Sequence, residues 1–211
     1  MRHIFCIVGE SGSGKSTLYN KILEDKTFCK DTKLKPLCYG TTRAPRNGEK
    51  HGVEYYFYTK DDFIKIPSED FIENRYYHTI NNGDVNYFTL KSHIQYGMSD
   101  DNYIATASPA QYRSYLEWAK NEPDISVELL RIEVPVIERL HRIMSRMGSS
   151  RDEDIYEMCR RITDEKEEFD TNLRDLEKDL NHMIFLKNYH NDDLEQVISN
   201  ACGFISTIVC K

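Results

Sequence analysis

The chain has 211 residues, a length that suits one domain with room for inserted subdomains. Its 35 acidic and 28 basic residues give a net charge of −7, which argues against a binder of polymeric nucleic acid. No run of about 18 apolar residues occurs, so we expect no membrane association, and six scattered cysteines without an export signal indicate free thiols in a reducing, cytoplasmic compartment.

The first elements of the chain predict the opening of an α/β fold. Ile4 to Val8 is a continuous apolar run, typical of a strand buried on both faces of a parallel sheet. A Gly/Ser-rich loop follows, and the apolar spacing then predicts a helix from Ser16 to about Asp25.

Positions 51–91 have a different composition. Tyrosine and phenylalanine are dense, and Asn81-Asn82-Gly83-Asp84 is a hairpin turn signal between two aromatic runs. We therefore expect a small antiparallel sheet inserted into the α/β core.

The remainder of the chain alternates between apolar runs and helical stripes. The pattern predicts strands at 103–107, 127–134 and 183–186, and helices after position 108, at 136–147, at 152–179 and at 194–208. The acidic stretch 164–168 is expected to be a solvated helix face. The alternation as a whole predicts a three-layer α/β fold.

A loop built for phosphate binding follows the first strand. The run from Gly9 to Thr17 matches GxxxxGK[ST] in full, between a predicted strand and a predicted helix. Glycines let successive backbone N–H groups point at phosphate oxygens, Lys15 is expected to reach the β- and γ-phosphates, and Ser16 is expected to bind Mg²⁺. The sequence therefore predicts an ATP site with Mg²⁺, formed by Gly9, Glu10, Ser11, Gly12, Ser13, Gly14, Lys15, Ser16 and Thr17.

A second anion site is expected after the first helix. Arg43 and Arg46 lie three residues apart around Pro45, and two such guanidinium groups can fork onto one phosphate, with a hydroxyl donor from Tyr55. A solvated loop is the ordinary interpretation of an arginine pair. Its combination with the triphosphate loop favours a monophosphate site.

The run from Thr41 to Phe57 also carries a resemblance. It matches TTRxPRxGExxGxxYxF residue for residue and so resembles the guanylate kinase family. The resemblance implies an ATP-dependent phosphotransferase that converts GMP or dGMP to GDP or dGDP, active as a monomer or homodimer. It also implies a P-loop kinase core with a parallel sheet (1–38, 90–135 and 166–211), a small inserted mixed α/β acceptor-binding subdomain (39–89) and a helical lid (136–165).

The same resemblance implies roles for further residues. Glu73 of the segment Phe71-Ile72-Glu73 is expected to read the guanine edge, Tyr87 to contact the monophosphate, and Thr89 to contact the base. Asn191 is expected near adenine. The expected catalytic residues are Lys15, Arg43, Arg139, Arg146 and Arg161, with Arg146 preferred over Arg142 and Arg151 for one lid position.

Three positions depart from the family pattern. An Asp-x-Asp pair is usual where this chain has Ala105 and Ala107, and a guanine-contacting serine is usual where it has Tyr39, which we assign to the acceptor site. These departures leave two alternatives open. One is a P-loop kinase for another nucleoside monophosphate or a sugar phosphate, and the other is a non-catalytic binding module, against which the complete P-loop argues.

Overall fold

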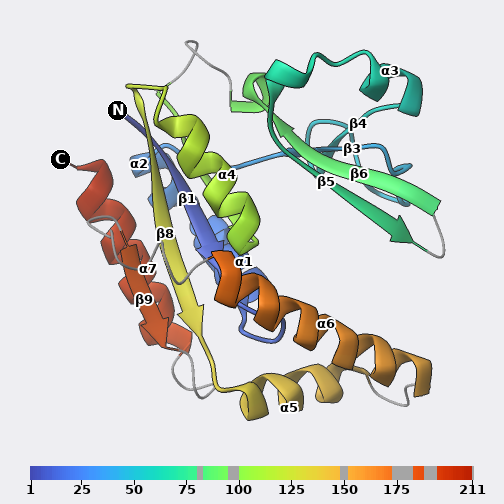
Figure 1. The fold of residues 1–211 in the computed structure, drawn as a ribbon. Coiled ribbons are helices and arrows are strands. Elements are labelled where there is room, and N and C mark those ends of the chain that lie inside the picture. The colour runs from blue at the N-terminus through green and yellow to red at the C-terminus, as the bar shows by residue number, and fades with distance from the viewer. Residues whose placement is uncertain (80–82, 95–99, 148–151, 173–182, 188–193, 211) are drawn as a thin grey trace.

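The central layer is a parallel sheet of five strands in the order β2-β7-β1-β8-β9 (Figure 1). The structure, a computed structural model, describes residues 1–79, 83–94, 100–147, 152–172, 183–187 and 194–210. All four neighbouring strand pairs are parallel, as the apolar runs predict. The strands are β1 (Arg2–Val8), β2 (Leu34–Pro36), β7 (Asn102–Ala107), β8 (Ile125–Glu133) and β9 (Met183–Lys187).

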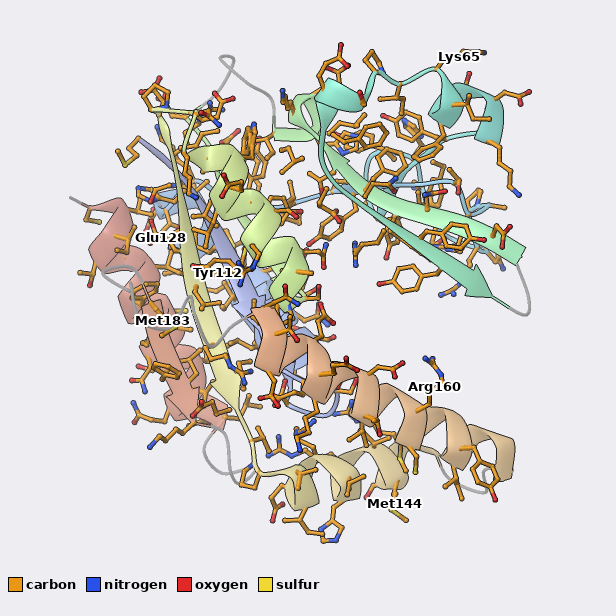
Figure 2. All side chains as sticks on the ribbon, in the orientation of Figure 1. Lys65, Tyr112, Glu128, Met144, Arg160 and Met183 are labelled. Carbon is orange, nitrogen blue, oxygen red and sulfur yellow. The ribbon has the colours of Figure 1, made fainter. Side chains whose placement is uncertain are left out.

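Helices cover both faces of this sheet, which confirms the predicted three-layer α/β class. On one face lie α1 (Lys15–Glu24) and α7 (Leu194–Val209), whose buried side chains share a core with Phe5 and Leu130. On the other face α4 (Pro109–Ala119) inserts Tyr112, and α6 (Asp152–Asn172) inserts Phe169 near its C-terminus (Figure 2). A short helix that the sequence analysis did not predict, α2 (Lys26–Asp31), follows α1 and is capped by Asp25.

The inserted segment forms its own sheet, in the order β4-β3-β6-β5. Its elements are β3 (Tyr39–Thr41), β4 (Tyr55–Phe57), α3 (Lys60–Ile64), a 3-10 turn at Ser68–Asp70, β5 (Phe71–Thr79), β6 (Gly83–Leu90) and a 3-10 turn at Lys91–Ile94. The antiparallel prediction is correct for β3, β6 and β5 but wrong for β4, which runs parallel to β3. Parallel strands need a connection of about a dozen residues, and the loop 42–54 provides one.

A pair of helices projects from the main sheet. After β8, α5 (Val136–Met147) runs away from the core, and α6 returns beside it (Figure 1). The C-terminal part of α6 packs against α4, where the backbone N–H of Ala110 donates to Glu168 over 3.3 Å. The α5–α6 pair therefore connects the carboxyl end of β8 with the outer surface of α4.

Candidate active site

The loop between β1 and α1 has the geometry of a phosphate cradle. Gly14 is the N-cap of α1 with a φ of 97°, a left-handed conformation that favours glycine. Gly12 also has a positive φ, and a Cβ there would lie 2.7 Å from the backbone oxygen of Arg139. The Lys15 ammonium folds back onto the loop and donates to the carbonyls of Gly9 and of Glu10, the latter over 3.1 Å.

Three arginines surround this loop. Arg131 donates to the Glu10 carboxylate over 3.1 Å, Arg139 donates to the Ser11 carbonyl over 3.4 Å, and Arg142 donates to the Gly12 carbonyl over 3.4 Å. Arg131 and Arg139 are buried. Arg131 also lies over the ring of Phe169, with its guanidinium carbon 4.4 Å from the ring centroid. The loop is therefore enclosed by positive charge from the end of β8 and the start of α5.

A carboxylate from α6 also reaches the loop. The backbone N–H of Ser11 donates to Glu165 Oε2 over 2.7 Å, and the Ser11 hydroxyl donates to Glu165 Oε1. Burial lowers the pKa of Lys15, and the nearby carboxylates of Glu165 and Glu10 oppose that shift. The prediction of a solvated face at 164–168 is thus wrong for Glu165, because the return of α6 brings its carboxylate to an N–H group of the phosphate loop.

A cavity of about 410 Å³ opens between the main sheet and the inserted sheet. That volume falls within the range of about 300–1,000 Å³ that small-molecule sites occupy. It is lined by Tyr39, Arg43, Arg46, Glu49, Tyr55, Arg75, Tyr77, Tyr87 and Thr106. Five of the seven predicted acceptor residues therefore line one cavity: Tyr39, Arg43, Arg46, Tyr55 and Tyr87. Glu73 and Thr89 do not belong to its lining.

One end of the cavity is organised around Arg43. Its two terminal nitrogens donate to the two carboxylate oxygens of Glu49 over 2.9 and 3.0 Å, and its Nε donates to the Tyr87 hydroxyl over 3.2 Å. The ring of Tyr55 lies beneath the guanidinium, 5.4 Å from its central carbon. Hydrogen bonding to Glu49 raises the pKa of Arg43, and the same contact lowers the pKa of Glu49. Arg43 is thus a fixed cation, oriented before any ligand arrives.

An acidic and a basic residue of β5, Glu73 and Arg75, form an ion pair at the cavity, and of the two Arg75 belongs to the lining. Glu73 is 6% exposed and accepts a hydrogen bond on each carboxylate oxygen, from Arg75 Nε over 2.9 Å and from the Thr89 hydroxyl over 2.9 Å. The Thr89 hydroxyl also pairs with the Tyr115 hydroxyl over 2.7 Å. Arg75 therefore faces the cavity, while Glu73 and Thr89 lie in the buried layer beside it.

Of the three positions that depart from the family pattern, Tyr39 lines the cavity and the two alanines lie in the core beside it. Ala105 and Ala107 are buried in the core cluster against which Tyr39 packs. The Tyr39 hydroxyl donates to the Thr106 carbonyl over 2.9 Å, and burial raises its pKa. Ser108 caps α4 by accepting from the Gln111 N–H. An aromatic ring and two methyl groups thus occupy the end of β7, without a carboxylate.

The phosphate cradle and the cavity lie at the same edge of the main sheet. In the parallel register of β1 and β7, Ile7 pairs with Thr106 and Val8 pairs with Ala107. The phosphate loop begins at the next residue, Gly9, and Thr106 lines the cavity. The carboxyl ends of adjacent parallel strands therefore bring the two predicted anion sites side by side, as in other open α/β sheets.

The contacts described above do not test the roles predicted for the remaining residues. Arg146 is exposed near the end of α5 and Arg161 belongs to α6, whereas Arg151 and Asn191 lie outside the described residues. Their assigned roles stay predictions. Arg142, which the sequence analysis ranked behind Arg146, is the lid candidate with a contact to the phosphate loop.

A magnesium ion that arrives with ATP would find few protein ligands here. Ser16 is exposed at the start of α1, and no group of three or more His, Cys, Asp or Glu side chains that could hold a metal is found in the part of the chain that the structure describes. Mg²⁺ usually keeps several waters and takes other ligands from the substrate phosphates. One hydroxyl from Ser16 fits an ion that is carried mainly by the nucleotide.

Several of these residues were not identified from the sequence. Glu49 is part of the matched motif, but the sequence assigns it no role, and Arg131 and Glu165 are distant in the chain from the phosphate loop that they contact. Arg75 could have been found, because residues i and i+2 of a strand share a face and Glu73 had already been assigned to the site.

Residues 1–207 match the family model of guanylate kinase. Guanylate kinase from Mycoplasmopsis pulmonis is 29% identical over 157 residues, covering 73% of this chain and 75% of that protein. Guanylate kinase from Mycoplasma genitalium is 32% identical over 174 residues, covering 79% of this chain and 63% of that protein. A shorter match, 44% identical over 68 residues, joins the chain to guanylate kinase from Schizosaccharomyces pombe and covers 32% of each.

The fold agrees with these matches. The crystal structure of guanylate kinase from Anaplasma phagocytophilum superposes with a TM-score of 0.58 at 16% sequence identity, covering all of this chain and 87% of that one. Within the residues that the structure describes, no helix has the length and apolar character that crossing a membrane requires.

Proposed function

This chain belongs to the guanylate kinase family, and from that premise we propose that it is an ATP-dependent nucleoside monophosphate kinase that converts GMP to GDP and dGMP to dGDP. The observation that carries the proposal is the adjacency of a phosphate cradle and an arginine-lined cavity at the carboxyl ends of β1 and β7. A transfer between two phosphorylated molecules requires two anion sites whose reacting phosphates can approach each other.

The proposed donor site is the loop from Gly9 to Thr17. Its N–H groups and the ammonium of Lys15 would bind the phosphates of ATP, and the N-terminus of α1 adds partial positive charge. Arg139, together with Arg142 or Arg146 and with Arg161, would neutralise charge that develops on the transferring phosphoryl group. Ser16 would hold Mg²⁺ together with the phosphates of ATP, and the ion would supply further charge neutralisation. Asn191 is proposed to lie near adenine.

The proposed acceptor site is the cavity. Arg43, Arg46, Tyr55 and Tyr87 would bind the monophosphate, because all four line the cavity and can donate to phosphate oxygens. The base would extend toward Tyr39, with Glu73 and Thr89 in the layer behind it. Glu49 has a supporting role, since it orients Arg43 by a two-point hydrogen bond before the acceptor binds.

Closure of two segments would complete the site. We propose that the insert 39–89 moves over the acceptor and that the segment 136–165 moves over ATP, on a core of 1–38, 90–135 and 166–211. Such closure excludes water from the transferring phosphoryl group and limits hydrolysis of ATP. A reducing, cytoplasmic compartment, where ATP and GMP are available, is the proposed location.

A coupled phosphotransfer assay tests the proposal. Purified protein is supplied with ATP, Mg²⁺ and one acceptor at a time from GMP, dGMP, AMP, CMP, UMP and sugar phosphates, and ADP formation is followed. We expect turnover with GMP and dGMP well above that with every other acceptor. Binding of GMP without turnover would contradict the kinase assignment, and faster turnover of another acceptor would contradict the assignment of GMP.

A further inference from the structure

Among the residues that the structure describes, Arg75 is the lining arginine that lies beside Tyr39 and Glu73, where the base is proposed to bind. Its guanidinium carbon lies 5.9 Å from the centre of the Tyr39 ring, and its Nε donates to Glu73. The other two lining arginines, Arg43 and Arg46, come from the loop 42–54, and Arg43 donates to the Tyr87 hydroxyl. Although the cross-strand partner of Arg75 on β6 is Tyr87, its hydrogen bond to Glu73 directs the Arg75 side chain toward the residues assigned to the base.

The salt bridge with Glu73 determines how Arg75 is presented. A guanidinium has five N–H donors in a rigid fork, and one of them, on Nε, is directed at Glu73. The two terminal nitrogens are left at the end of the fork, on a side chain that lines the cavity and is 27% exposed. Glu73 thus fixes the plane of the Arg75 guanidinium. The cavity is lined at this point by the terminal N–H groups of Arg75 and not by the carboxylate of Glu73.

We propose that Arg75 is a specificity-determining residue that reads the acceptor base by donating from its terminal nitrogens to O6 and N7 of guanine, with Glu73 as its positioning residue. The proposal rests on the proposed function. Guanine presents O6 and N7 as adjacent acceptors, and a two-point contact with arginine is its commonest specific recognition mode. Adenine presents an amino donor at the position of O6, which would face the donors of Arg75.

The consequence is a distinctive pattern among purine nucleotides. IMP retains O6 and N7 but lacks the 2-amino group, whereas 7-deaza-GMP retains the 2-amino group and lacks N7. If the carboxylate of Glu73 reads the base directly through N1 and N2, IMP is the poor acceptor. If Arg75 reads it, 7-deaza-GMP is the poor acceptor, because one of the two donors loses its partner.

The first experiment therefore uses the unmodified protein. We expect kcat/KM for IMP within about 10-fold of the value for GMP, and kcat/KM for 7-deaza-GMP lower than for GMP by about 10-fold or more. Equal rates with GMP and 7-deaza-GMP, together with a large loss for IMP, would overturn the proposal. If GMP is not phosphorylated at all, the proposed function fails first, so the two failures are distinguishable.

Variants then assign the effect to Arg75. In Arg75→Ala and Arg75→Lys we expect GMP and 7-deaza-GMP to become equal acceptors and the preference for GMP over AMP to fall by about 10-fold or more. The lysine variant keeps a cation beside Glu73 if the alanine variant unfolds. Asn74→Ala is the matched control, because Asn74 is the exposed neighbour on β5 and pairs with Asn86 away from the cavity. A uniform loss with every monophosphate would instead assign Arg75 to the phosphate and overturn the proposal.

Discussion

Lys15 is the residue on which the donor site depends most directly. Its ammonium already lies inside the phosphate loop, where it bonds to the Glu10 carbonyl over 3.1 Å. We expect Lys15→Ala to lower kcat by at least about 100-fold, because one preformed positive charge at the transferring phosphoryl group is lost. Steady-state kinetics measure this loss, and a thermal melt checks that the fold survives. Lys21→Ala, an exposed lysine of the same helix, is the control that keeps full activity.

Arg43 provides the corresponding prediction for the acceptor site. Its fork is oriented by Glu49 and by the Tyr87 hydroxyl, in the cavity that we propose as the acceptor site. Arg43→Ala should raise KM for GMP by about 10-fold or more while KM for ATP changes less, since a charge-assisted contact contributes roughly 1.5–3 kcal/mol. Initial-rate kinetics with each substrate varied in turn measure both constants, and the exposed Lys65→Ala serves as the control. Equal effects on both substrates would contradict the two-site arrangement.

At the scale of secondary-structure elements, α6 acts on the phosphate loop through one carboxylate. Glu165 accepts from the N–H and the hydroxyl of Ser11, in a loop whose donors would otherwise serve phosphate oxygens. The proposed binding of ATP in this loop would therefore require ATP to displace this carboxylate or to bind beside its negative charge. We expect Glu165→Gln to lower Kd for ATP by roughly 3- to 10-fold, as removal of one charged competitor should.

The test of this contact is a titration of nucleotide binding. Isothermal calorimetry with a non-hydrolysable ATP analogue compares Glu165→Gln with Glu167→Gln, a change of the same charge at an exposed position of the same helix. Weaker binding in the Glu165 variant would mean that the carboxylate supports the loop and does not compete with ATP. An equal change of Kd in both variants would mean that the net charge of the protein, and not the contact of Glu165 with Ser11, determines the effect.

The sequence predicts those helices and strands whose residue pattern is contiguous in the chain. The strand–loop–helix unit at the N-terminus, the later strands and the family resemblance are confirmed, because apolar periodicity and the GxxxxGK[ST] motif are contiguous. Pairing partners were harder to predict. The parallel pairing of β4 with β3 depends on the path of a long loop, and the contact of Glu165 with Ser11 joins residues 154 positions apart.

At the scale of the whole molecule, the site exists because two sheets meet at Thr106 and Tyr39. The motifs predicted which residues bind phosphate, but the relative position of the two sites follows from the β1–β7 register, which no motif encodes. The core likewise contains a group that the apolar pattern of β8 did not predict. Glu128 (Figure 2) is fully buried, and its Oε1 accepts a hydrogen bond from the Ser126 hydroxyl and lies 2.9 Å from His3 Nδ1, so this carboxyl group has polar partners within the core.

The inserted sheet carries a histidine that couples the stability of the fold to pH. His93 is 5% exposed and stacks on Tyr56, with the hydroxyl of Tyr58 3.2 Å from its Nε2. The backbone N–H of Leu90 donates to Nδ1 over 3.2 Å, so Nδ1 must be unprotonated and Nε2 carries the hydrogen. Burial, with a smaller contribution from His51, lowers the pKa of His93 to about 4.

The lowered pKa of His93 makes the folded protein less stable as the pH falls. The unfolded chain binds a proton at His93 near pH 6.5, whereas the folded protein binds it only near pH 4. The contribution of neutral His93 to the free energy of unfolding is therefore complete above pH 6.5 and is lost as the pH falls from 6.5 to about 4. The loss amounts to at most about 3 kcal/mol. Urea unfolding at several pH values should give a shallower pH dependence for His93→Gln than for the unmodified protein and for the exposed His141→Gln. An unchanged slope in His93→Gln between pH 6.5 and 4.5 would mean that His93 binds a proton as readily in the folded protein as in the unfolded chain.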